Sequence, residues 1–259
     1  MRYTSDLTDN EWQLIDYCFP KPSKQGRPRE HSFRELLNGV FYVAKTGCQW
    51  RNLPKDFAPW GTTYHYFRLW KHNGLLEEIH THLREHLRLV EERKSQPSAA
   101  IIDSQSVKSS ETSDERGYDA GKKINGRKRH ILVDTMGLLL KVMVLPANIQ
   151  DRDGGKQLLH AFFPQKSHRK VKHIWADGGY TGTLVAQARK LWRCNIEIVK
   201  RSELHTFKVL PRRWVVERTF GWFGRSRRLS RDYERQAQTG ETMVYLTMIR
   251  LMLARLGKV

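Results

Sequence analysis

Long apolar runs are absent from this sequence of 259 residues, and cysteine is scarce. No stretch approaches the roughly 20 apolar residues that cross a bilayer, so we expect neither a membrane span nor a membrane partner. The first residues also lack the apolar segment of a secretory signal. The three cysteines (Cys18, Cys48 and Cys194) are too scattered for a disulfide framework or a zinc site. These absences predict a soluble protein of a reducing compartment, which in a bacterium is the cytoplasm.

Acidic residues are also few in relation to basic ones. The chain has 46 Lys and Arg against 27 Asp and Glu, a formal net charge of +19. A surplus of this size repels itself in the compact state and is typical of a protein with a polyanionic partner, so we expect nucleic acid and association with the nucleoid. The apolar fraction of 39%, with eight tryptophans, is enough to build cores and argues against a disordered basic arm.

Residues 1–95 have helical periodicity. Thr8 with Glu11, and Ser32 with Glu35, have the spacing of a capping box, and Gly47 is a suitable helix end. Helices are predicted over residues 32–45, 62–73 and 75–92, with a linker at 94–98. We interpret 1–95 as a helical DNA-binding domain that resembles a helix-turn-helix. A plain helical bundle is equally compatible, because a connection of about 14 residues is longer than the usual turn.

After residue 98 the pattern changes from helical to mixed. Short apolar runs typical of strands occupy residues 99–103, 130–134, 138–144, 171–176 and 195–199. Helical patterns occupy residues 154–163, 182–192, 211–227 and 241–256. A basic, glycine-containing loop is expected over 109–127. This order predicts an α/β domain over 96–259, with a mixed sheet flanked by helices, and it resembles the ribonuclease-H-like fold of families that cut or join nucleic acids.

Three carboxylates stand where this topology would bring them together. Asp103 and Asp177 each end an apolar strand, and Glu217 lies on the penultimate helix. Ligand crevices form at the carboxyl ends of neighbouring parallel strands. Converging carboxylates require a cation, because like charges raise one another's pKa. Oxygen ligands select Mg²⁺ or Mn²⁺, and two such ions about 4 Å apart promote phosphodiester displacement.

Each of these acids has a simpler explanation when it is taken alone. Asp103 and Asp177 could each cap a turn. Glu217 follows Arg213 by four residues, the spacing of a weak surface ion pair. Their joint occurrence at the matching elements of one topology, beside a basic surface, favours the metal site.

Other acids of this half are predicted to be structural. Asp134 closes a strand that runs antiparallel to the first, so we assign it to a hairpin. Asp151 and Asp153 begin a helix, where acids favour the N-terminal end of the dipole, and are expected to be caps. The helix at 154–163 contains no glutamate, so the third carboxylate must come from elsewhere, and Glu217 is the candidate.

Several segments together resemble the insertion-sequence DDE transposases of the insertion-sequence-five group. The similar segments are residues 50–54, 63–67, 102–104, 126–134, 147–154, 176–182 and 213–222. The resemblance implies that Asp103, Asp177 and Glu217 are the catalytic, metal-binding triad. The family's Tyr-x2-Arg-x3-Glu-x6-Lys signature is met at Arg213 and Glu217. Its tyrosine and lysine positions hold Leu210 and Gly224, and Arg225 is the expected substitute for the lysine as a phosphate contact.

Basic side chains are expected to contact DNA in both halves of the chain. The candidates in the second half are Lys108, Lys122, Lys123, Arg127, Lys128, Arg129, Arg213, Arg218 and Arg225. In the first half the helix at 62–73 would offer Thr62, Thr63, His65, Arg68 and Lys71 to a groove. The alternative is a solvated helix face and a mobile loop. Phosphate neutralisation predicts binding that weakens steeply with salt.

The predicted function follows from this resemblance. We expect a transposase that binds the ends of an insertion sequence, cleaves a phosphodiester there with two Mg²⁺ or Mn²⁺ ions, and joins the 3′-hydroxyl to target DNA. The expected partners are double-stranded DNA, as terminal repeats and target, and a second copy of the chain in a homodimer on DNA. The alternatives are a metal-dependent nuclease of the same fold and a non-enzymatic DNA-binding repressor.

Overall fold

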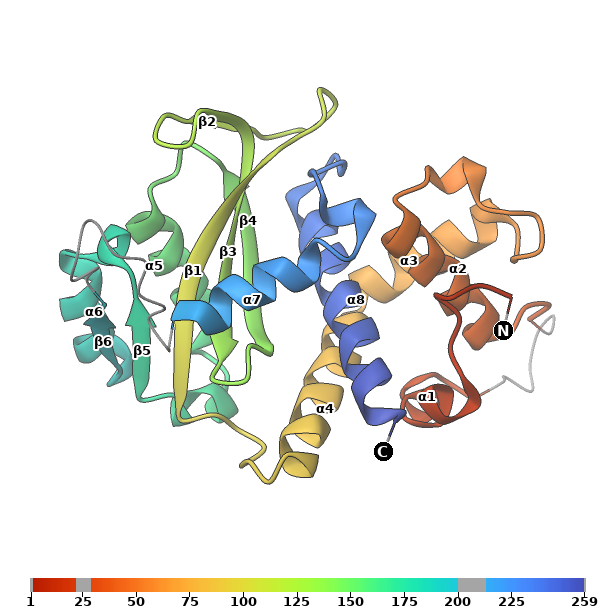
Figure 1. Ribbon diagram of the computed structural model, residues 1–259, viewed down its shortest axis with the longest axis horizontal. Coiled ribbons are helices and arrows are strands. Elements are labelled where there is room, and N and C mark those ends of the chain that lie inside the picture. Colours follow the sequence, from red (N-terminus) through yellow and green to blue (C-terminus); the bar gives the residue numbers. More distant parts are fainter. Residues whose placement is uncertain (1, 22–28, 200–212, 259) are drawn as a thin grey trace. The chain divides into compact units, whose positions relative to one another are not determined.

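The structure is a computed structural model that describes residues 2–21, 29–199 and 213–258, and it divides into two compact units (Figure 1). Unit 1 consists of Met1–Glu91, Arg225–Leu229 and Thr242–Val259, and unit 2 of Glu92–Gly224 and Ser230–Glu241. The division after Glu91 lies close to the expected boundary at residue 95. Two C-terminal segments nevertheless group with unit 1, because compactness depends on packing and not on order along the chain.

Unit 1 is helical, and its local signals match the sequence pattern. Its elements are α1 (Asp9–Gln13), η1 (Asp16–Cys18), α2 (Phe33–Thr46), η2 (Trp50–Asn52), α3 (Trp60–His72), α4 (Leu75–Val90), η5 (Arg227–Leu229) and most of α8 (Ala237–Leu256). Thr8 and Glu11 form the predicted capping box of α1, and Ser32 accepts the Glu35 N–H at the start of α2. Gly47 ends α2 with φ of 73°, a conformation in which a side chain would be strained.

Long-range contacts join the C-terminal helix to the N-terminal helices of unit 1. Arg250 of α8 donates to Glu11 of α1 at 2.6 Å. His80 of α4 packs edge-on against Tyr245, with ring centroids 5.0 Å apart.

Within the described residues, no helix is both long enough and apolar enough to span a bilayer.

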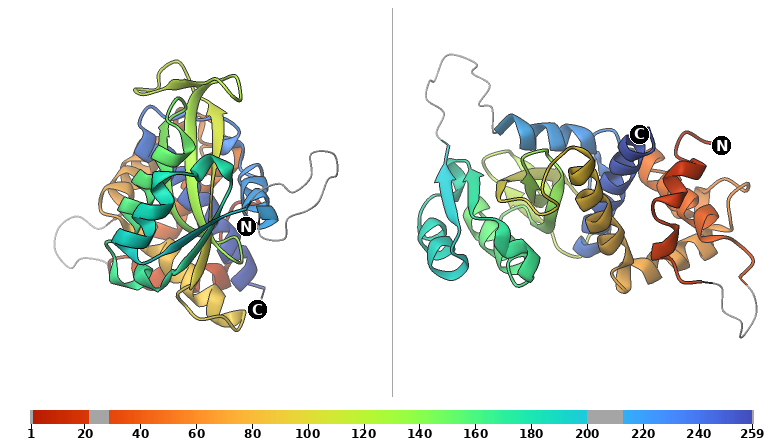
Figure 2. Two further views of the ribbon diagram at one scale, coloured as in Figure 1. Left: turned by 90° about the vertical axis from the view of Figure 1, so that its left-hand side faces the viewer. Right: turned by 90° about the horizontal axis from the view of Figure 1, so that it is seen from below.

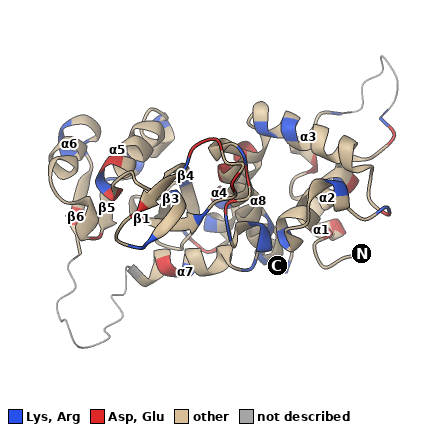
Figure 3. Ribbon diagram, turned by 90° about the horizontal axis from the view of Figure 1, so that it is seen from above, with Lys and Arg blue, Asp and Glu red and all other residues tan. Residues whose placement is uncertain are grey.

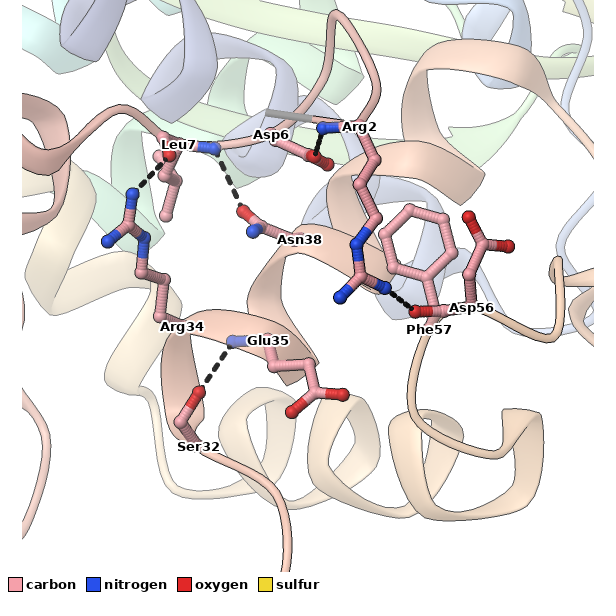
Figure 4. A pocket seen from close by; sticks show the side chains of 9 residues that line it. All are labelled: Arg2, Asp6, Leu7, Ser32, Arg34, Glu35, Asn38, Asp56 and Phe57. Atoms are coloured by element: carbon pink, nitrogen blue, oxygen red, sulfur yellow. Dashed lines mark hydrogen bonds between the residues drawn. The ribbon is translucent and has the colours of Figure 1, made fainter.

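A pocket of about 310 Å³ lies in unit 1 (Figure 4). Arg34 donates to the carbonyl oxygen of Leu7 at 2.7 Å, and the Oδ1 atom of Asn38 accepts the Leu7 N–H at 2.9 Å. Arg2 donates to the carbonyl oxygen of Asp56. These bonds tie the N-terminal segment to α2 and to the segment before α3.

Unit 2 is built on a six-stranded mixed sheet. Five strands have the order β2-β3-β1-β5-β6, and β4 also pairs with β3. The strands are β1 (Ala99–Lys108), β2 (Gly117–Asp119), β3 (Ile124–Asp134), β4 (Leu139–Pro146), β5 (His173–Ala176) and β6 (Asn195–Ile198). β3 is antiparallel to β1, β2 and β4, whereas β1, β5 and β6 are parallel. The mixed sheet predicted from the order of elements is confirmed.

Strands β1 and β3 are longer than their apolar runs predict. β1 continues to Lys108 and β3 begins at Ile124, so the last part of the loop expected at 109–127 is strand, and the short β2 lies within it. The extensions carry polar residues that are buried with partners. The hydropathy of the sequence could not reveal these strand extensions, because the groups that pair with their polar residues come from distant segments.

Helices cover both faces of the sheet in unit 2. The elements are α5 (Asp151–Phe162), η3 (Lys166–Lys170), η4 (Gly178–Tyr180), α6 (Thr183–Trp192) and α7 (Arg213–Phe223). Helices α5 and α6 lie on one face and α7 on the other, as the views in Figures 2 and 3 agree. The main core lies between the sheet and the α5–α6 layer, around Ile102, Leu132, Leu158 and Ile174.

Candidate active site

Asp103 and Asp177 occupy equivalent positions on neighbouring parallel strands. Ile101 of β1 pairs with Trp175 of β5, and the two aspartates each lie two residues further along. Neighbouring strands are about 4.8 Å apart. Because β5 ends at Ala176, Asp177 is the first residue beyond the strand. The prediction that Asp103 and Asp177 lie together on neighbouring parallel strands is confirmed, but Asp103 does not end its strand, because β1 continues to Lys108. The metal-binding role of the two aspartates stays a prediction.

The alternation of side chains along β1 places Asp103 on the α7 face of the sheet. Ile102 belongs to the core under α5, and Ser104 bonds to Asp151 of α5, so these two neighbours face the other way. Asp177 accepts the Gly179 N–H at 2.9 Å and thereby caps η4. The turn at Asp177 was also the simpler explanation for that residue, and the two roles are compatible, because a carboxylate has several acceptor sites.

Glu217 lies on α7, the helix that packs against β1. Thr219 donates to the Gly137 carbonyl oxygen at 2.8 Å and Arg218 to that of Met136 at 3.0 Å, so α7 is held on the turn between β3 and β4. Val216 is buried, whereas the Glu217 side chain is exposed. The third predicted carboxylate is therefore carried by the helix on the same face of the sheet as Asp103.

The carboxylate pair has the donor chemistry that a hard divalent cation requires. In the part of the chain that the structure describes, no three His, Cys, Asp or Glu residues are arranged to hold a metal ion. Mg²⁺ commonly takes only one or two carboxylates and completes its shell with water and substrate phosphates. Asp103 and Asp177 fit this mode of binding, and α7, which packs on β1, carries the predicted Glu217.

A further carboxylate, that of Asp151 in α5, lies close to Asp177. Burial, together with the negative charges of Asp103, Asp151 and Asp177, raises the pKa of the fully buried Tyr180 phenol well above its usual value. A side chain at position 179 would begin 3.1 Å from Asp177 and 3.3 Å from Asp151, so Gly179 allows the two acids to approach the same backbone.

Asp151 and Asp153 lie in the first turn of α5, as predicted, but the expectation that they cap the helix is wrong. The residue at the cap position is Gln150, which makes no side-chain capping bond, and the Asp151 carboxylate instead binds Ser104 and Lys128. Burial favours the neutral acid, but the Ser104 hydrogen bond and the Lys128 charge outweigh it and hold the pKa of Asp151 below its usual value. No signal in the sequence identified Ser104 as this partner, because it lies in the polar stretch that follows the apolar run of β1.

Three of the predicted DNA contacts are corrected by the structure. Arg127, Lys128 and Arg129 are each at most 5% exposed. Arg127 donates to the Glu234 carbonyl oxygen at 2.8 Å, and Lys128 donates to that of Ile149 at 2.9 Å. These cations are used inside unit 2 and are not available to a phosphate backbone. Sequence alone could not separate them from exposed cations, because their partners lie tens of residues away.

The other predicted basic contacts differ in accessibility. The exposed ones are Arg68, Lys108, Lys122, Lys123 and Arg225, and Lys71 is half-buried. Arg218 is also half-buried, with its guanidinium 5.0 Å from the Trp222 ring. The side chain of Arg213 and the whole of Leu210 lie outside the described residues.

Helix α3 presents only part of its predicted contact set. Thr63 is fully buried and donates to the Ala58 carbonyl oxygen at 3.2 Å, so its assignment to a DNA groove is wrong. Thr62 is half-buried, and His65 and Arg68 are exposed. Thr63 is buried because it lies four residues before Phe67, so both side chains lie on the inward face of the helix.

The mixed sheet with helices on both faces defines the class of unit 2, which is a ribonuclease-H-like domain. Residues 94–252 match the transposase DDE domain, and residues 7–80 match the family described as putative transposase of IS4/5 family. The chain belongs to the insertion-sequence DDE transposases of this IS4/5 type.

Two relatives come from the insertion element IS402 of Burkholderia cepacia. The chain is 32% identical over 117 residues to its putative transposase, an alignment that covers 43% of this chain and 56% of the relative. It is 30% identical over 124 residues to an uncharacterized 16.2 kDa protein of IS402, covering 46% of this chain and 78% of the relative. The chain therefore spans little more than half the length of the putative transposase. No solved structure matches the chain.

Proposed function

We propose that this chain binds the ends of an insertion sequence, cleaves a phosphodiester at each end and joins the freed 3′-hydroxyl to target DNA. The observation that carries the proposal is the equivalent placement of Asp103 and Asp177 on neighbouring parallel strands, next to the helix that bears Glu217. Residues 1–95 would recognise the DNA ends, and residues 96–259 would perform the chemistry.

The proposed cofactor is Mg²⁺ or Mn²⁺, as two ions held by Asp103, Asp177 and Glu217. When bound, the ions would activate the attacking oxygen and stabilise the leaving oxygen. Asp103 is already oriented by the Ser104 N–H, and Asp177 by the Gly179 N–H, so both carboxylates are held in place before substrate arrives.

The two chemical steps balance without a nucleotide cofactor or a covalent enzyme intermediate. In the first, a water oxygen forms a bond to phosphorus, the bond from phosphorus to the 3′-oxygen of the element breaks, and that oxygen leaves as a hydroxyl. In the second, this 3′-hydroxyl attacks a target phosphodiester and displaces a target 3′-hydroxyl. One phosphodiester is exchanged for another, so no energy source is needed.

Exposed cations would hold the DNA during these steps. Lys122 and Lys123 follow β2, Lys108 ends β1, and Arg68 lies on the exposed side of α3. Arg225 stands beside the position of the family's lysine and would contact the phosphate near the cleaved end. Since two ends must be held at once, we expect a homodimer on DNA.

The test uses Asp103→Asn, Asp177→Asn and Glu217→Gln in the full chain, with Asp153→Asn as a matched control on an exposed acid outside the site. We expect the three variants to lose Mg²⁺-dependent cleavage and joining while they keep binding to the DNA ends, and the control to behave as wild type. The assay combines gel shift with strand transfer into a plasmid.

Each other result would indicate a different function for this chain. Cleavage that never yields joined products would identify a metal-dependent nuclease of the same fold. DNA binding without cleavage by the wild type would identify a repressor. Full cleavage by any of the three variants would remove that residue from the site.

A further inference from the structure

A polar network lies directly behind Asp103, on the α5 face of the sheet. Ser104 donates through Oγ to Asp151 at 2.7 Å, and the Lys128 ammonium lies 3.0 Å from the same carboxylate oxygen. Lys128 is 5% exposed and Ser104 is 7% exposed, so both are shielded from water, whereas the Asp151 side chain is 27% exposed. In such surroundings a charge is retained only where it is paired and hydrogen-bonded.

A second, parallel arrangement lies two residues further along β1. Ser106 donates to Asp119 at 2.5 Å, and Asp119 lies 3.5 Å from Lys128. The two serines therefore face the same way, and each binds one aspartate that is paired with one shared lysine. Of the two serines, only Ser104 adjoins Asp103.

Ser104 links Asp151 to the candidate metal ligand. Its backbone N–H donates to Asp103 Oδ1 at 2.7 Å, while its hydroxyl is held by Asp151 on the other face of the strand. Asp103 and Ser104 point to opposite faces of β1, so Asp151 does not share the ligand position of Asp103. Asp151 is connected to Asp103 through Ser104 and the peptide that joins residues 103 and 104.

We propose that Asp151, with Lys128 as its counter-charge, is a positioning residue that fixes Ser104 and thereby orients Asp103 to receive a divalent cation. The inference rests on the proposed function, because it assumes that Asp103 is a metal ligand. Partners that orient metal ligands change metal affinity or activity by about 10- to 100-fold when they are removed.

The test measures Mn²⁺ affinity of the full chain by titration calorimetry, independently of any DNA reaction. Ser104→Ala and Asp151→Ala each remove the hydrogen bond, and we expect either to raise the Mn²⁺ dissociation constant by about tenfold. Ser104→Thr keeps the hydroxyl and should restore wild-type affinity. The double variant should be no weaker than either single one, because both changes break the same link.

Ser106→Ala is the matched control, since it removes the equivalent serine–aspartate bond at a position that does not adjoin Asp103. It should leave Mn²⁺ affinity unchanged even where it lowers the melting temperature. The proposal is wrong if Ser104→Ala and Asp151→Ala bind Mn²⁺ as the wild type does, or if Ser106→Ala weakens binding equally.

Asp103→Asn separates failure of this inference from failure of the proposed function. If Asp103→Asn loses Mn²⁺ binding while the Ser104 and Asp151 variants keep it, only the positioning role is overturned. If Asp103→Asn binds Mn²⁺ as the wild type does, the proposed metal site itself is overturned.

Discussion

Arg127 and Asp232 form a buried ion pair, with 3.4 Å between Nη1 and Oδ2 and both side chains 1% exposed. The pair joins β3 to the segment that follows α7. Arg127 also donates to the Glu234 and Arg235 carbonyl oxygens, so one cation satisfies several buried acceptors. A residue that composition alone would assign to a DNA-binding surface is thus part of the interior of unit 2.

Loss of Arg127 should be costly to stability. Arg127→Ala removes the ion-pair partner of the buried Asp232 and the donor to the Glu234 and Arg235 carbonyl oxygens, so we expect the free energy of unfolding to fall by about 3–5 kcal/mol. Urea denaturation followed by tryptophan fluorescence measures this loss. Arg235→Ala is the control, because the Arg235–Asp114 pair is largely exposed and its loss should change stability little. Equal losses in the two variants would contradict a structural role for the buried pair.

Acid should destabilise unit 2 through His130. Burial lowers the pKa of His130 from 6.5 to about 4, and within the described residues neither ring nitrogen has a hydrogen-bond partner. Between these pH values the unfolded chain binds the proton and the folded chain does not. The contribution of neutral His130 to the free energy of unfolding is therefore complete above pH 6.5. It is lost as the pH falls, by up to about 3 kcal/mol.

The measurement is the urea midpoint of wild type and His130→Gln at pH 7.5 and 5. Since Gln does not titrate, the difference between the two proteins should shift in favour of the variant at the lower pH. A difference that stays constant with pH would show that His130 is not the acid-sensitive group.

Gly154 allows α5 to approach the sheet at His130. A Cβ at this position would lie 2.3 Å from the His130 ring, so Gly154→Ala should destabilise the protein by about 1–3 kcal/mol or more. His130→Ala should relieve the clash, so the double variant should be more stable than additivity predicts. The control is Gly221→Ala in helix α7, where a Cβ meets nothing within 4 Å and alanine should be neutral or stabilising.

The exposed cations near β2 should contribute to DNA binding through phosphate contacts. Lys122→Ala with Lys123→Ala should weaken binding to any duplex and should reduce the slope of log affinity against log salt by about 2. Fluorescence anisotropy at several salt concentrations gives the slope. The control is Arg189→Ala with Lys190→Ala, an exposed basic pair on α6 that nothing assigns to DNA. An identical change in both double variants would show that only net charge matters.

Helix α3 should carry part of the preference for the element's ends. Arg68→Ala should reduce the affinity for end DNA over random DNA by about 1–3 kcal/mol if Arg68 reads a base. Thr63→Ala, a buried change on the same helix, should lower the melting temperature and leave that ratio unaltered. A loss of affinity that is equal for end and random DNA would limit Arg68 to a phosphate contact.

The local features of this protein were determined by the sequence itself. The capping box at Thr8 and the helix end at Gly47 involve residues within a turn of one another, so their chemistry acts before any tertiary contact exists. The placement of Asp103 and Asp177 on neighbouring parallel strands was also predictable, because each follows a short apolar run, although β1 continues beyond Asp103. The roles of Asp103, Asp177 and Glu217 in metal binding stay predictions.

Only the tertiary structure decided which polar groups are buried. Arg127, Lys128 and Arg129 have the same local appearance as Lys122 and Lys123, but they become interior cations because acceptors from α5 and the 230–241 segment reach them. For the same reason Asp151, which the sequence predicts to be a helix cap, is instead a hydrogen-bond partner of Ser104. A charge becomes favourable in the interior only where distant groups compensate for its lost water, and that compensation exists only after the chain has folded.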